Sequence, residues 1–247
     1  MKKIFLSSIL SSSLLFGALS ESEILEIFKG DNSQLKYSID SRKNLPNTNF
    51  EEIKIKISDG KKSVYSALYS DGEYIFPDII DIKNNFSYLE NFENEQSKIA
   101  LKEATKSLAK VIKSLPKDSI ITLGNDKDKE VKYLFTDPDC PFCRQDLESI
   151  ENKLEKSNLK VILAPVSSHG IPAIKKSIAI LNEAKNAKDD ATKIAILRKY
   201  FSINAKEPTG ISDKKISEFK SQVDRIFATG AVRGVPTLID AKDLGLW

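Results

Sequence analysis

The chain has 247 residues, with 38 lysines and arginines against 35 aspartates and glutamates, so its formal net charge is +3. Basic and acidic residues are interspersed, as in Glu151–Lys156, and form no basic stripe of the kind that binds nucleic acid. At this length, a hydrophobic content of 40% is sufficient for one large domain or two modest ones with real cores. We therefore expect folded domains and no nucleic-acid partner.

Residues 1–20 have the pattern of a secretory signal peptide. Met1–Lys3 is a short basic start, Ile4–Ala18 is mostly apolar, and Ala18–Ser20 fits a cleavage site. A transmembrane anchor is the alternative, but an apolar run of about 15 residues that contains several serines is too short and too polar to span a bilayer. We therefore expect cleavage before Glu21 and export of the mature chain, to a compartment where cysteine pairs can cycle.

Residues 21–90 are expected to form a small α+β domain. Glu21–Lys29 has the apolar spacing of a short helix, ended by Gly30, and a polar loop follows. Two Asp-Gly turns then separate three predicted antiparallel strands, at Ile53–Ile57, Val64–Tyr69 and Tyr74–Phe76. This segment has no cysteine or histidine, which indicates a role in scaffolding, association or substrate binding.

Residues 91–116 are predicted to form a linker helix that ends at Pro116. A narrow apolar stripe recurs at three- and four-residue steps, at Leu101, Ala104, Leu108, Val111 and Leu115. The stripe fits a helix packed on its own domain, and it fits equally a rigid spacer that holds two domains apart. The sequence leaves both open.

The only two cysteines, Cys140 and Cys143, are separated by Pro141 and Phe142. The apolar run Val131–Phe135 before them predicts a buried strand, and helical spacing follows them. Cys140 then lies at the helix N-cap and Pro141 at the first helical position, for which proline is suited. Unpaired amides and the helix dipole favour a thiolate at Cys140, so we predict a solvent-accessible nucleophile there. Cys143 is placed to resolve a mixed disulfide.

Two other interpretations compete with redox chemistry. A structural zinc site needs about four Cys or His ligands, and beyond this pair the sequence offers only His169. An inert structural disulfide would close a very short loop, with little chain entropy to remove. We therefore predict redox chemistry, with no metal and no organic cofactor.

Residues 117–247 have the element order strand, Cys-containing helix, strand, helical insertion and strand. Ile120–Leu123 and Val131–Phe135 are predicted to form a hairpin, and Leu159–Ala164 to form another buried strand. Residues from about 171 to 229 have helical spacing, and Gly234–Ile239 is extended again.

Two segments resemble the periplasmic thiol:disulfide interchange proteins of the DsbC/DsbG type. Phe135–Arg144, with the sequence FTDPDCPFCR, is similar to their active-site segment, and Gly230–Thr237 is similar to their cis-proline loop. The resemblance implies an α+β N-terminal domain and an α/β thioredoxin-like domain with a helical insertion, joined by a linker helix. It also implies a cis bond before Pro236 and a substrate-binding loop of Val235, Pro236 and Thr237 beside Cys140, where the Val235 backbone would pair with a client strand. Pro141 and Phe142 would tune the active site by setting how well the Cys140 thiolate is stabilised.

The function implied is that of a periplasmic thiol:disulfide isomerase or oxidoreductase, which reshuffles or reduces wrong disulfides. Its partners would be unfolded or misoxidised exported proteins and a membrane thiol reductase, and residues 21–86 would form a homodimer. Two alternatives use the same fold, namely a dithiol oxidase and a reductase for cytochrome maturation. A third, of another class, is a holdase chaperone. Clients, redox direction and reduction potential are not fixed by the sequence.

Several features depart from the resemblance. Leu134 stands where thioredoxins carry an acidic residue, six positions before the first cysteine. Asp137 and Asp139 are expected to be solvated loop residues whose charge Arg144 could offset, and a solvated position is expected for His169 as well. Two further elements of the family, a strand and a terminal helix, have no counterpart after the cis-proline strand, so we expect a shortened sheet edge or an incomplete chain.

Overall fold

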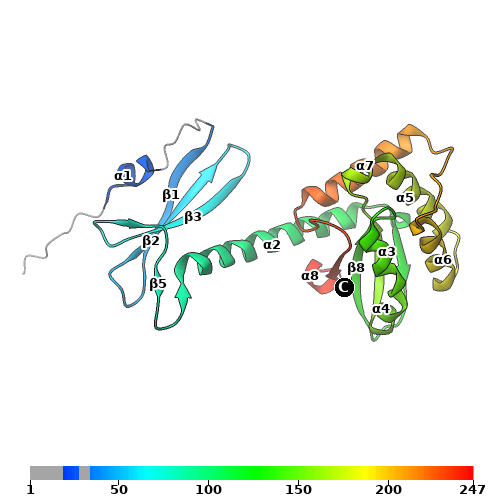
Figure 1. Ribbon diagram of the computed structural model, residues 1–247, viewed down its shortest axis with the longest axis horizontal. Helices are drawn as coiled ribbons and strands as arrows, with labels where there is room; N and C mark the ends of the chain where they lie inside the picture. Colours follow the sequence, from blue (N-terminus) through cyan, green and yellow to red (C-terminus); the bar gives the residue numbers. More distant parts are fainter. Residues whose placement is uncertain (1–18, 28–33, 247) are drawn as a thin grey trace, which may run out of the picture. The chain divides into compact units, whose positions relative to one another are not determined.

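The computed structural model describes residues 19–27 and 34–246 (Figure 1). Most of the predicted signal peptide, and the end of the first predicted helix at Gly30, lie outside these residues. The described chain divides into two compact units, the first ending at Lys98 and the second beginning at Ile99. Among the described residues, no helix combines the length and the apolar character that crossing a membrane requires.

The first unit contains a four-stranded antiparallel sheet in the order β1-β2-β3-β4. Its elements are α1 (Glu21–Glu26), β1 (Lys36–Asn44), β2 (Glu51–Ser58), β3 (Ser63–Ser70), β4 (Ile75–Phe76) and a separate ribbon of β5 (Ile80–Asp81) and β6 (Phe86–Ser87). The alternation in β2 places Ile53 and Ile55 on the inner face, where they are fully buried with Ile24 of α1. A capping box between Ser20 and Glu23 fixes the start of α1.

Strand β1 lies where the sequence predicts a polar loop. Its residues are mostly polar, but it pairs with β2 along its length, with a register shift between Ile39 and Ser41. Tyr37 and Ile39 pack against the core that Ile53 and Ile55 form. Pairing with the strongly alternating β2 therefore overrides the weak strand propensity of this segment.

Helix α2 (Tyr88–Ser114) runs from the first unit into the second. In the second unit, its apolar stripe is buried from Leu108 onward, together with Ile112 and Leu115, whereas Leu101 is exposed. This C-terminal half of the helix packs on one face of the sheet in the second unit, against Tyr133, Phe135 and Ile162.

The second unit is built on a four-stranded sheet in the order β10-β8-β9-β7. The strands are β7 (Ile120–Leu123), β8 (Glu130–Thr136), β9 (Ser157–Leu163) and β10 (Thr237–Asp240). Strands β8 and β9 are parallel, and β7 and β10 are antiparallel to their neighbours. The predicted hairpin of β7 with β8 is therefore wrong, because β9 lies between them. Asn158 holds the β7–β8 connection in this position by hydrogen bonds to the backbone N–H and carbonyl of Asp126.

The helices of the second unit cover both faces of this sheet (Figure 1). They are α3 (Pro141–Glu148), α4 (Ile150–Lys156), α5 (Gly170–Ala184), α6 (Asp190–Phe201), α7 (Asp213–Ala228) and α8 (Ala241–Leu244), with 3-10 turns at Lys117–Ser119 and Ser167–His169. The predicted helix after the cysteines is thus two helices, α3 and α4, which meet at Ser149. Strand β10 is an edge strand, and the short α8 follows it, with Ala241 and Leu244 buried in the core.

Candidate active site

Cys140 is the N-cap of α3 and Pro141 is its first helical residue, as predicted. The Cys140 backbone is extended, and its carbonyl accepts the first intrahelical hydrogen bond, from the Arg144 N–H at 3.0 Å. The Cys140 N–H donates to the carbonyl of Asp137 at 3.2 Å, which closes the turn between β8 and α3. The Cys140 sulfur therefore lies at the positive end of a helix, where a negative charge is favoured.

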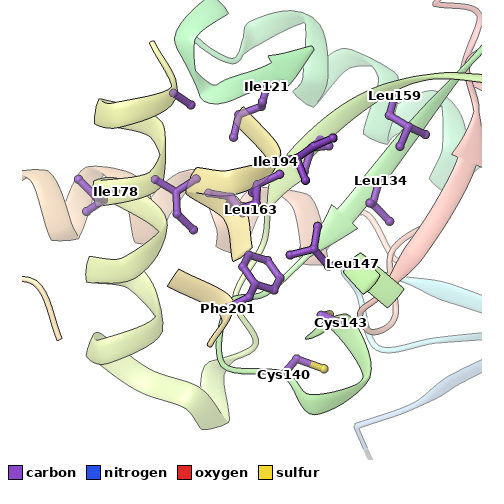
Figure 2. Packing of buried hydrophobic residues seen from close by; sticks show 14 of the residues in the cluster. Ile121, Leu134, Cys140, Cys143, Leu147, Leu159, Leu163, Ile178, Ile194 and Phe201 are labelled. Carbon is purple, nitrogen blue, oxygen red and sulfur yellow. The ribbon is translucent and has the colours of Figure 1, made fainter. Parts of the chain in front are cut away.

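Both cysteines are free thiols and both are buried, so the predicted solvent accessibility of Cys140 is wrong for this structure. Cys140 is 5% exposed, while Phe142 between the cysteines is 71% exposed. Figure 2 shows the cysteines at the edge of the core cluster that includes Leu147 and Phe201. Cys140 is covered because the loop before β10 lies over it, with the Val235 carbonyl oxygen 3.7 Å from its sulfur.

The two thiols have different electrostatic surroundings. Burial raises the pKa of the Cys143 thiol well above its usual range, and the adjacent Cys140 acts in the same direction. Hydrogen bonds to the Thr136 side chain and to the Asp137 backbone N–H oppose this rise. Cys143 is therefore held as a protonated thiol inside the helix, and Cys140 is the cysteine at the helix terminus.

The loop that faces Cys140 contains the three residues predicted for it. The peptide bond between Val235 and Pro236 is cis, as predicted. Thr237 begins β10, and its hydroxyl donates to the Gly234 carbonyl at 2.6 Å. Pairing of Thr237 with Phe135 of β8 brings this loop to the cysteines, across 95 residues of sequence.

Two acidic residues near the cysteines are not the solvated loop residues that the sequence predicts. Asp137 is fully buried, and its carboxylate lies 2.7 Å from the Nδ1 atom of His169. Asp139 is paired with the largely buried Lys176 of α5, at 2.6 Å. Both partners, His169 and Lys176, lie on the segment after β9. The fold places this segment beside the turn between β8 and α3, which we call the active-site turn.

Arg144 does not offset either acid, because its Nε atom donates to the Phe201 carbonyl at 2.5 Å. The sequence signal that points to Asp137 and His169 is weak. It consists of an acidic residue directly after a buried strand and the single histidine of the chain in a loop after the next strand.

A cavity of about 600 Å³ opens beside the cis-proline loop. Its walls come from the loop after β9, from α5 and α7, and from the residue two positions before Val235; they include Pro165, Val166, Ile171, Ile174, Phe227 and Arg233. Within the described parts of the chain, no three or more His, Cys, Asp or Glu side chains are grouped so that they could hold a metal ion.

A Cys-X-X-Cys pair at a helix N-terminus, facing a cis-proline loop on a mixed sheet, is the arrangement of a thioredoxin-like domain. The solved structure of Helicobacter pylori DsbG is similar to this chain, with a TM-score of 0.50 and 21% identity over 89% of this chain and 98% of DsbG. This likeness confirms the predicted resemblance at the level of the fold.

Two other solved structures match smaller parts of the chain. The match to a linker-deletion variant of Proteus mirabilis ScsC covers 62% of this chain and 79% of that chain, with 19% identity and a TM-score of 0.39. The match to Pseudomonas aeruginosa DsbA2 covers 51% of this chain and 81% of that chain, with 17% identity and a TM-score of 0.39. No family model and no curated protein matches the sequence.

Proposed function

We propose that this chain is an exported thiol:disulfide exchange protein of the isomerase type, with Cys140 as nucleophile and Cys143 as resolving cysteine. One observation carries the proposal. The Cys140 sulfur is at the N-terminus of α3 and 3.7 Å from the Val235 carbonyl, while Cys143 is buried one turn further into the helix. This places an attacking sulfur, a resolving sulfur and a backbone acceptor for an extended client within one small region.

The first step is attack of the Cys140 thiolate on one sulfur of a client disulfide. The client S–S bond breaks, a Cys140–client disulfide forms, and the second client sulfur leaves as a thiolate. When another client thiolate attacks the mixed disulfide, the client carries a new disulfide and Cys140 is released as a thiolate. This route changes the client pairing with no net oxidation or reduction.

The second route is reduction. Cys143 loses its proton and attacks the Cys140 sulfur, so the client leaves as a dithiol and the protein holds a Cys140–Cys143 disulfide. A membrane thiol reductase would then supply the two electrons that restore the dithiol. Because burial raises the pKa of Cys143, this step is slowed and the mixed disulfide persists. A persistent mixed disulfide gives client thiols time to attack it, which favours the isomerase over a dithiol oxidase.

Clients in this proposal are unfolded or misoxidised proteins of the periplasm. Their extended backbone would pair with Val235, beside Pro236 and Thr237, as strands add to an exposed sheet edge. The exposed Phe142 and the apolar walls of the neighbouring cavity would contact client side chains on either side of the reacting cysteine. Pro141 would act by starting the helix that carries Cys140.

A homodimer formed through residues 21–86 is the quaternary structure we propose. The first unit exposes several large apolar side chains, which are Val64, Tyr74, Ile80 and Ile82. Within the described part of the first unit, β1 is an edge strand of the sheet and pairs with β2. Exposed apolar side chains and a sheet edge are features that association with a second chain would cover.

Two cysteine variants test the proposed roles. With Cys143→Ala, the mixed disulfide has no internal route of release, so client adducts should accumulate on a non-reducing gel. With Cys140→Ala, the adducts should be absent and the refolding of scrambled ribonuclease should be lost. If both variants support the refolding of scrambled ribonuclease as well as the wild type does, neither cysteine has the role proposed for it, and the exchange proposal gives way to the holdase alternative.

The direction of exchange is tested by trapping the thiols in cells with an alkylating agent. An isomerase or reductase is expected to hold Cys140 and Cys143 as thiols at steady state. A largely oxidised pair would contradict this and assign the protein to the oxidases.

A further inference from the structure

Asp137 is a buried carboxylate that the exchange steps do not themselves use. It is 0% exposed, and a carboxylate in that position is costly unless donors surround it. One carboxylate oxygen accepts from the Asp139 N–H at 2.9 Å. The other accepts from the Val166 N–H at 2.9 Å and lies 2.7 Å from His169 Nδ1.

The main chain of Asp137 contacts both cysteines. Its carbonyl accepts from the Cys140 N–H at 3.2 Å, and its own N–H is hydrogen-bonded to the Cys143 sulfur. The buried carboxylate is therefore carried by the residue whose main chain is hydrogen-bonded to both cysteines. A negative charge so placed opposes formation of a thiolate at Cys140 unless a cation balances it.

His169 is the group that can balance this charge. It is the only histidine of the chain, and its side chain is 27% exposed, so protons can reach it from solvent. Because a carboxylate only accepts hydrogen bonds, Nδ1 carries the hydrogen in this contact. The imidazole keeps that hydrogen bond whether it is neutral or protonated, so protonation at its other nitrogen changes only its charge.

Charged side chains on the elements next to this loop have hydrogen-bond partners of their own. They lie on the active-site turn, on α5, on α7 and on the loop before β10, and they are Asp139, Lys176, Lys220, Asp224 and Arg233. Lys176 is paired with Asp139, and Lys220 with Asp224, each at 2.6 Å. The Arg233 guanidinium donates to the carbonyl of Gly230 at 3.4 Å. His169 is the group that contacts the buried carboxylate of Asp137.

We propose that Asp137 and His169 are a positioning pair for the redox centre, and that the charge of His169 controls how readily Cys140 forms its thiolate. This inference rests on the proposed role of Cys140 as nucleophile. With His169 protonated, the pair is neutral overall and the thiolate is favoured. With His169 neutral, the buried carboxylate is unbalanced and opposes the thiolate. Reactivity in acid is thereby preserved.

The rate of Cys140 alkylation in His169→Gln tests this coupling. Glutamine keeps a hydrogen-bond donor and removes the charge. The variant should react about fivefold more slowly than the wild type at about pH 5.5, and within about twofold of it at about pH 8.5. Lys185→Gln is the matched control, since it removes a cation from an exposed ion pair with Asp118, and it should change neither rate.

An equal slowing at both pH values would show a purely structural role for His169 and overturn the inference. No reaction of Cys140 in the wild type at either pH would instead contradict the proposed function. The two failures are therefore distinguishable.

A second measurement uses the wild-type protein and so does not depend on any variant folding. The single histidine gives one set of ring proton signals in an NMR titration. Since coupling between two sites is reciprocal, its titration midpoint should lie about half a pH unit higher in the reduced protein than in the disulfide form. Asp137→Asn should remove this difference. Identical midpoints in the two wild-type forms would overturn the inference.

Discussion

Cys140 and Cys143 have the same side chain and are three residues apart, yet the fold gives them different surroundings. Cys140 is the N-cap of α3, at the end of the helix where the first backbone N–H groups have no intrahelical partner. Cys143 is fully buried inside the first turn, and burial raises the pKa of its thiol. The division of roles that we propose, with Cys140 attacking and Cys143 resolving, rests on this difference in position.

Thr136 is expected to control the resolving step. Its side chain is hydrogen-bonded to Cys143 and lowers the pKa of that thiol against the larger effect of burial. Thr136→Val should raise the pKa of Cys143 further and slow resolution of a preformed mixed disulfide by about threefold to tenfold, with little effect on the first attack. Stopped-flow mixing with a model disulfide separates the two phases. Thr105→Val on α2 is the control, and an unchanged second phase in Thr136→Val would contradict this role.

Tyr69 is expected to reduce the stability of the first unit. Its ring is fully buried, and among the described residues its hydroxyl has no hydrogen-bond partner. Tyr69→Phe removes this unpaired group and should stabilise the protein by about 1 kcal/mol in urea unfolding. Tyr74→Phe, at an exposed position, should be neutral. A loss of stability in Tyr69→Phe would show that the hydroxyl does have a partner.

Tyr69 also gives a prediction for alkaline pH. Burial, followed by the charges of nearby acids, raises the pKa of its hydroxyl in the folded state. The unfolded chain ionises this group near its ordinary value of about 10, so ionisation favours unfolding and stability is lost as pH rises above that value. The loss should be smaller in Tyr69→Phe, and identical alkaline profiles would contradict the prediction.

The residues with covalent chemistry were predictable, because spacing and local context define them. The cap position of Cys140 and Pro141 at the first helical position follow from the spacing of residues 131–154, whereas the cis bond before Pro236 was implied by the family resemblance of its loop. The burial of Asp137 was not predictable. It depends on donors from Val166 and His169, which the parallel pairing of β8 with β9 brings to the active-site turn.

At the scale of elements, α6 supports the active-site helix. Phe201, at the end of α6, is 1% exposed and belongs to the core cluster that contains both cysteines. Its carbonyl accepts a hydrogen bond from Arg144 of α3. The helical insertion therefore packs against the helix that carries the cysteines.

Phe201→Ala should destabilise the second unit by about 3–5 kcal/mol, because it removes a large buried ring and leaves a cavity. Unfolding in urea, followed by fluorescence, measures the change. Ile203→Ala, two residues further on and 79% exposed, is the matched control and should cost little. Similar values for the two variants would show that the insertion is not packed on the active-site helix.

Periodicity predicted the helices of the second unit well, since α5, α6 and α7 each bury one apolar face. Strand pairing was predicted less well. Neighbouring strands in the sequence often form hairpins, but β7 pairs with β9 through contacts between residues about 40 positions apart. The sequence did not predict the weakly apolar β1 as a strand for a similar reason. Its extended conformation depends on pairing with β2, which local sequence does not reveal.

For the whole molecule, the proposed homodimer is the property that most affects function. Light scattering on the purified protein at micromolar concentration should give about twice the monomer mass. Val64→Lys, which places a charge at a position that is 62% exposed on β3, is a first probe of the surface involved. A monomer over the full concentration range would remove the dimer and favour the monomeric oxidase alternative.

The central claim is that Cys140 attacks disulfides and Cys143 resolves the product. Incubation of the purified protein with oxidised glutathione, followed by acid quenching and intact mass spectrometry, tests it directly. Cys143→Ala should gain one glutathione on Cys140, the wild type should pass through the same adduct to an internal disulfide, and Cys140→Ala should remain unmodified. Glutathione on Cys143 of Cys140→Ala, at the rate seen for Cys143→Ala, would contradict the account.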